Sequence, residues 1–170
     1  MKKVLSIFVA AMACAVMLVS CAKSNFQNEL NAMNKAVETK DYATIVTNAT
    51  TIINGIDKAA AGDLVSAGTM LNTVVTLKQQ DGSLNPQEAI DLYNQASKAL
   101  EAAKSKSDYN ATVATFKGAG VDVEALAASI PNAVASFQAV IDAETQQAEA
   151  EAEGEGEAEE GAEEGAEDAE

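Results

Sequence analysis

The stretch that decides the fold runs from Asn85 to Lys104 and reads NPQEAIDLYNQASKALEAAK. Asn85 suits the N-cap of a helix, Pro86 suits the first helical position, and Glu88 suits the third. Apolar residues then recur at intervals of three and four, which is the spacing of one helix face. These inward positions are Ala89, Tyr93, Ala96, Leu100 and Ala103. The stretch therefore predicts an amphipathic helix with a well-marked start.

The same spacing precedes this helix three times. Apolar residues at intervals of three and four predict helices over residues 26–37, 42–56 and 64–75. Asp41 is expected to cap the second of these helices, and Gly55 lies near its end. The turn residues of Gln80-Asp81-Gly82-Ser83 are expected to end the third.

Helical signals also continue downstream. Asp108 is expected to cap a short helix that stops at Gly118-Ala119-Gly120, and Asp122 is expected to begin another. Pro131 either starts a new helix or kinks a continuing one. A last apolar stripe comprises Ile130, Val134, Phe137 and Ile141. No window alternates with the period of a strand, so residues 26–147 are predicted to be all-α, a helical bundle or short α-α superhelix of about five to seven helices.

A repeat is suggested by two helix starts in similar places. Asp41-Tyr42-Ala43-Thr44-Ile45-Val46 and Asn85-Pro86-Gln87-Glu88-Ala89-Ile90 begin the second helices of successive hairpins. The overlapping segment Glu88-Ala89-Ile90-Asp91-Leu92-Tyr93, with Ala96, resembles the second helix of a tetratricopeptide repeat. The resemblance covers residues 30–104. It implies a concave protein-binding surface. The two starts are 44 residues apart, whereas that family repeats at about 34, and generic antiparallel helices produce the same pattern.

The N-terminus carries a different kind of signal. Lys2 and Lys3 precede an apolar run of about fifteen residues, which is shorter than the ~20 that a membrane-spanning helix needs. The run closes with Leu18-Val19-Ser20-Cys21. Residues 1–21 thus resemble a bacterial lipoprotein signal peptide with its lipobox. A short transmembrane anchor is the alternative interpretation.

This resemblance implies cleavage of the signal peptide, lipidation of the new N-terminus and a location at the membrane. Residues 1–20 would be removed by cleavage between Ser20 and Cys21, and Cys21 would carry the lipid, including palmitate. Residues 21–25 would then form a lipidated tether. Two acyl chains suffice for stable membrane anchoring, at ~0.8 kcal/mol for each buried methylene. Ala22 after the cysteine resembles the pattern of lipoproteins sent to the outer membrane, on its periplasmic or surface face.

Composition argues against several classes of function. The chain has 11 basic residues against 26 acidic ones and a net charge of −15, so no basic stripe exists for nucleic acid. All the basic residues are lysines, and histidine is absent. The commonest acid-base side chain and the commonest transition-metal ligand are therefore missing. The only cysteines are Cys14 and Cys21, so the mature chain would hold no disulfide. No cofactor and no enzymatic activity are predicted.

Acidic residues crowd the C-terminal end. From Glu144 onward the sequence consists almost wholly of Glu, Ala, Gly and Gln, without lysine. Residues 148–170 are predicted to be a disordered tail, because like charges repel and no large apolar residue could hold them to a core. Such a tail either keeps an anchored domain soluble or binds cations diffusely and engages a basic partner.

Other candidate sites are weaker. Residues Asp81 to Glu88 match the later half of a calcium-binding loop, but Leu77 and Gln79 stand where earlier oxygen ligands belong, so no metal site is predicted. Acids such as Asp57, Asp91 and Glu101 are expected on solvated helix faces rather than in a catalytic pair. A groove between the helices that contain Tyr42 and Tyr93 is the expected binding face.

The sequence therefore predicts a non-catalytic protein-interaction or scaffold module of the bacterial envelope, anchored through Cys21 and bound to an unidentified protein partner. The alternative is an envelope lipoprotein that binds a ligand or cation.

Overall fold

The computed structural model describes residues 24–159, and all of its regular secondary structure over that range is helical. The predicted signal peptide, Cys21 and the last residues of the tail, 160–170, lie outside the described residues. The α-helices are α2 (Gln27–Thr39), α3 (Tyr42–Asn54), α4 (Ala61–Asp81), α5 (Pro86–Lys104), α6 (Tyr109–Gly118) and α7 (Val123–Glu159), and a 3-10 helix, η1 (Ile56–Lys58), joins α3 to α4. The all-α prediction is confirmed.

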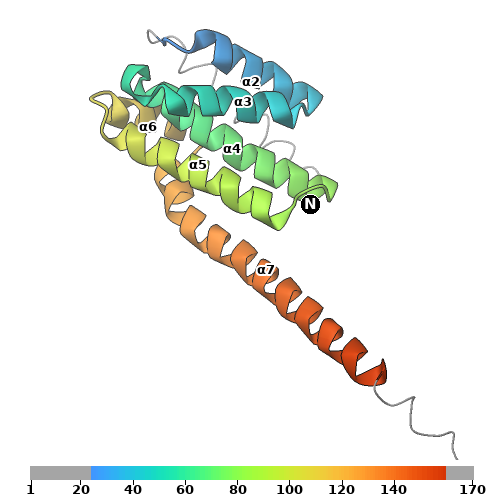
Figure 1. The fold of residues 1–170 in the computed structure, drawn as a ribbon. Helices are drawn as coiled ribbons and strands as arrows, with labels where there is room; N and C mark the ends of the chain where they lie inside the picture. The colour runs from blue at the N-terminus through green and yellow to red at the C-terminus, as the bar shows by residue number, and fades with distance from the viewer. Residues whose placement is uncertain (1–23, 160–170) are drawn as a thin grey trace, which may run out of the picture.

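The helices form a bundle in which, from α2 to α5, helices adjacent in sequence are adjacent in space. Helix α2 packs on α3, α3 on α4 and α4 on α5, as Figure 1 shows. Helix α6 is short and lies at the end of the bundle where α5 finishes. Helix α7 packs mainly on α5 and then continues beyond the body of the bundle. Short connections between adjacent helices thus account for most of the architecture.

Helix α4 is the central element of the core. The sequence predicted a single apolar stripe, but most of the helix is buried, including Ser66, Thr69 and Thr73. A helix surrounded by neighbours needs its polar groups to be satisfied locally. Thr69 does this by donating from Oγ1 to the carbonyl oxygen of Val65 at 2.9 Å, and Thr73 donates to that of Thr69 at 2.9 Å.

Small residues let α4 and α5 approach closely. A Cβ atom built on Gly68 of α4 would lie 2.9 Å from Cγ of Leu100 and 3.2 Å from the carbonyl oxygen of Ala96, both on α5. The facing side of α5 is rich in buried alanine. The contact between these two helices therefore depends on the missing side chain at residue 68.

The predicted helix starts are mostly confirmed. The Asn85 side chain accepts hydrogen bonds from the backbone nitrogens of Gln87 at 2.9 Å and Glu88 at 3.3 Å. Asp41 accepts from the nitrogen of Thr44 at 3.1 Å. Asp122 likewise accepts from that of Ala125 at 2.9 Å. These side chains satisfy backbone donors that the first turn of a helix leaves free.

The prediction that Asp108 caps the helix that follows it is wrong. Asp108 does precede α6, but its carboxylate makes no capping bond there. Both of its oxygens instead accept from the backbone nitrogen of Ala61, at 3.2 Å each. Ala61 is the first residue of α4, so the connection before α6 caps a helix 47 residues earlier in the chain. Only the folded chain brings these two groups together.

The end of the chain is more helical than expected. Pro131 lies inside α7 rather than starting a new helix. Ile130, just before it, is buried, so packing on the bundle holds the helix where proline removes one hydrogen bond. The helix also continues past the predicted domain boundary at residue 147, as far as Glu159. Alanine and glutamate have high helix propensity, which accounts for this extension.

Candidate functional site

An apolar stripe on α7 is the surface that stands out. After Ile130, no residue up to Glu149 is buried. Val134 and Phe137 are half-buried against the bundle, Ile141 is half-buried, and Val140 is 43% exposed, the only large apolar side chain in the exposed class among residues 24–149. We call Val134, Phe137, Val140 and Ile141 the α7 stripe. A helix that covers its apolar residues only partly leaves surface for another protein.

The α7 stripe is held in place through an aromatic contact. The ring of Phe137 lies against that of Tyr93 on α5, with centroids 6.2 Å apart and planes tilted by 37°. Burial raises the pKa of the Tyr93 hydroxyl above its usual value. The pair holds α7 against α5 at a centroid separation within the range of about 4.5–7 Å that is typical of aromatic pairs.

Acidic residues flank the α7 stripe on its C-terminal side. Asp142, Glu144 and Glu149 are all exposed, and no lysine follows Lys117 in the chain. A partner that covers the stripe would therefore meet negative charge immediately beside apolar surface.

The expected groove lies between the helices that contain Tyr42 and Tyr93, α3 and α5, but these two tyrosines have different partners. Tyr42 begins α3 and donates its hydroxyl to Oδ2 of Asp81, at 2.6 Å. Lys40 also binds that carboxylate, at 3.0 Å. Tyr93 instead contacts Phe137 of α7. Tyr42 thus ties the α2–α3 connection to the end of α4, whereas Tyr93 supports α7.

Burial and hydrogen bonds shift the pKa values of Tyr42 and Asp81. Burial, and then the hydrogen bond to Asp81, raise the pKa of Tyr42 from 10.0 to about 12. The bonds from Tyr42 and Lys40 hold the pKa of Asp81 below its usual range. The folded protein therefore favours a protonated tyrosine beside an ionised aspartate.

Tyr42→Phe should lower the thermal midpoint at neutral pH, and the difference from the unmodified protein should shrink in alkaline solution. A raised pKa means that the protonated hydroxyl contributes its full stability below pH 10 and loses it as the pH rises through about 12. Thermal midpoints measured along this pH range test the expectation. Tyr109→Phe controls for removing a hydroxyl elsewhere. A difference that stays constant into the alkaline range would contradict the assigned role of Tyr42.

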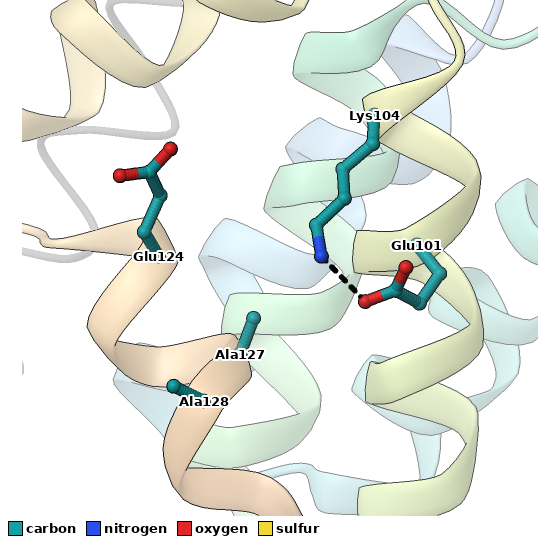
Figure 2. A pocket seen from close by; sticks show the side chains of 5 residues that line it. All are labelled: Glu101, Lys104, Glu124, Ala127 and Ala128. Carbon is teal, nitrogen blue, oxygen red and sulfur yellow. Dashed lines mark hydrogen bonds and ion pairs between the residues drawn. The ribbon is translucent and has the colours of Figure 1, made fainter.

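A shallow depression of about 310 Å³ lies between the end of α5 and the start of α7. It is lined by Glu101, Lys104, Glu124, Ala127 and Ala128, which Figure 2 shows. Lys104 donates to Glu101 at 2.6 Å, and this bond raises the pKa of the lysine. Glu124 points away from this pair in Figure 2. The charges do not converge on a common point, so the depression offers no obvious acid-base pair.

The other candidate acids have structural partners or face solvent. Asp57 and Asp91 are exposed, and Asp91 accepts from Nε2 of Gln87 at 3.1 Å. In the segment from Asp81 to Glu88, which partly matches a calcium-binding loop, Glu88 forms an ion pair with Lys78 and Asp81 forms one with Lys40. Among the described residues, no three His, Cys, Asp or Glu side chains come together as a metal-ion site would require.

Sequence reasoning missed the most buried carboxylate that the structure describes. Asp63, only 2% exposed, lies in the first turn of α4. It accepts from the backbone nitrogen of Ala60 at 3.0 Å and from the Ser24 hydroxyl at 2.6 Å. An acidic residue three positions after a helix start was the available signal. Its distant partner Ser24 could not be inferred.

Comparisons with known proteins identified no similar protein. A scan of protein-family models, a search of curated proteins and a search of solved structures each found no match. Within residues 24–159, none of the helices combines the length and the apolar character needed to cross a bilayer.

Proposed function

We propose that this chain is a lipid-anchored protein of the bacterial envelope that acts as a non-catalytic interaction or scaffold module. The observation that carries the proposal is the sequence Leu18-Val19-Ser20-Cys21 at the end of a short apolar run. Cys21 would hold the mature protein on the membrane, in the outer membrane on its periplasmic or surface face. The helical domain would then recruit a protein partner.

The α7 stripe is the surface that this partner would contact. Its half-exposed apolar residues supply area, and the acids beside it favour a partner of opposite charge. An amphipathic helix with lysine or arginine next to its apolar face has this chemistry. The proposal therefore commits to a basic amphipathic segment of another envelope protein.

The alternative function, ligand or cation binding, is supported by a different part of α7. The exposed acids Glu144 and Glu149 would attract cations diffusely, because counterions relieve the repulsion between carboxylates. Such binding would be weak and would weaken further with salt.

Val140→Glu should weaken binding of the partner protein, whereas the matched substitution Ala139→Glu should leave binding unchanged. Both substitutions add one acid to an exposed position of α7, but only residue 140 belongs to the α7 stripe. Placing a charge in an apolar contact should weaken binding by about tenfold or more.

Cross-linking of the lipidated proteins in intact envelopes, followed by quantitative mass spectrometry, measures this effect. A partner of the proposed kind is recovered with the unmodified chain and with Ala139→Glu but is depleted with Val140→Glu. Equal recovery with all three proteins would contradict the role of the α7 stripe.

A further inference from the structure

The first described residues do not behave as a free tether. The Ser24 hydroxyl donates to Oδ1 of the buried Asp63 at 2.6 Å, and it accepts from the backbone nitrogen of Phe26 at 3.0 Å. The Asn25 amide donates to the carbonyl oxygen of Lys58 at 2.7 Å. Residues 24–26 are thus fixed to the connection between α3 and α4.

Packing reinforces these hydrogen bonds. The ring of Phe26 lies so close to Gly55 that a Cβ atom there would be 2.4 Å from its Cζ. Only glycine at the end of α3 leaves room for the ring in this position. The point of attachment therefore combines a partly buried hydrogen bond to a carboxylate with an apolar contact.

The attachment point lies close in sequence to Cys21. Ser24 comes three positions after Cys21, and an extended chain spans at most about 3.6 Å per residue, so the attachment allows a lipid on Cys21 a distance of no more than about 11 Å from Ser24. A lipid at Cys21 would hold this end of the bundle near the bilayer.

The same end gathers several helix termini. It includes the start of α2, the end of α3 and the start of α4, and Asp108 joins the connection after α5 to Ala61. We call residues 24–26, 55–60 and 105–108 the anchored end. Figure 1 shows the start of α2, the end of α5 and helix α6 together on the left of the bundle.

Helix α7 leads away from the anchored end. Its first turns lie beside Glu101 and Lys104 near the end of α5, and Phe137 lies beside Tyr93 nearer to the start of α5. The two helices therefore run in opposite directions. Figure 1 shows α7 starting below α6 on the left and slanting away from the bundle toward the lower right.

We propose that the anchored end faces the lipid bilayer and that α7 directs the acidic segment away from it. This inference rests on the proposed lipid at Cys21. Helix α7 has 37 residues and is about 55 Å long at 1.5 Å per residue. Charges are screened over about 8 Å at physiological salt, so an exposed acid such as Glu149, far along the helix, escapes repulsion by anionic lipids.

The charges of the anchored end suit a lipid surface. Asp63 and Asp108 are both occupied in hydrogen bonds to the backbone at the start of α4. Lys106 donates from Nζ to the carbonyl oxygen of Ile56 at 2.6 Å. Lys58 and Asp57 are exposed and opposite in sign. The anchored end therefore brings no block of acids toward the bilayer, in contrast to α7.

Site-specific quenching tests the orientation on the full lipidated protein. Cysteine is introduced at Lys58 in the anchored end, at Gln80 at the other end of α4, or at Gln146 in α7, all exposed positions. A fluorophore on each cysteine is measured in vesicles of phosphatidylethanolamine and phosphatidylglycerol that contain a nitroxide-labelled headgroup lipid. Quenching should be strong at residue 58 and lost at residues 80 and 146, because α4 separates its two ends by about 30 Å.

Two results would overturn the orientation. The first is equal quenching at the three positions, and the second is stronger quenching at 80 or 146 than at 58. Inserting about ten Gly and Ser residues between Lys23 and Ser24 should abolish the contrast, because a flexible chain of that length lets the bundle turn. A contrast that survives the insertion would overturn the role of the short attachment.

Palmitate labelling of the same preparations separates failure of this inference from failure of the anchor. Labelled protein that shows no contrast overturns the orientation alone. Unlabelled protein overturns the proposed lipidation, and the orientation with it.

Discussion

Replacing Cys21 by alanine should abolish palmitate incorporation and leave the chain as an uncleaved precursor. The thiol of Cys21 is the only group in the proposed lipobox that can accept the lipid, and cleavage before residue 21 requires the lipidated cysteine. The effect is therefore complete rather than graded. Metabolic labelling with palmitate, combined with the mass of the accumulated chain, measures it.

Cys14→Ala is the matched control for this experiment. It removes the other cysteine of the sequence from within the apolar run and should leave labelling and cleavage unchanged. A Cys21→Ala protein that still incorporates palmitate would show that the anchor has been placed on the wrong residue.

Leu71→Ala should lower the free energy of unfolding by about 2–5 kcal/mol, the range for a leucine truncated in a tight core. Leu71 is fully buried on α4, at 0% exposure, where neighbouring helices surround it and cannot easily fill the cavity. Urea denaturation followed by circular dichroism at the helical signal measures the change.

Val140→Ala provides the comparison for Leu71→Ala. It also shortens an apolar side chain, but at an exposed position on α7, so its effect should stay within about 0.5 kcal/mol. Similar losses for the two variants would mean that α4 is not the centre of the core.

Local signals were sufficient to predict the helices. Asn85 and Asp41 cap backbone groups within three residues, so adjacent sequence determines both contacts. Pro131 was ambiguous because a proline is compatible with a helix start and with a helix interior. Packing of Ile130 on the bundle favours the continuous helix, and that contact is not a local property.

Contacts between distant residues could not be predicted in the same way. Asp108 has the sequence context of a cap for α6, yet it binds Ala61 of α4. Ser24 belongs to the segment predicted to be a lipidated tether, and nothing in that segment indicated its hydrogen bond to Asp63, 39 residues later. The all-round burial of α4 likewise depends on the positions of its neighbours. Single-residue patterns carry no information about which surfaces meet.

The sequence indicated the α7 stripe only in part. The spacing of Val134, Phe137 and Ile141 predicted an inward face, and Val134 and Phe137 do lie against the bundle, while Ile141 is half-buried. Their incomplete burial was not predictable, because spacing does not reveal whether one neighbouring helix or several will cover a face. The exposure of Val140 follows from the same arrangement.

The limited burial of α7 also determines which part of the protein unfolds first. Beyond Ile130 this helix contributes no buried residue up to Glu149, whereas α4 is enclosed by the rest of the bundle. Local unfolding begins where few apolar contacts must be broken. The amide hydrogens of this part of α7 should therefore exchange with solvent long before those of α4, and the segment would detach as a separate cooperative unit while α2 to α5 stay folded.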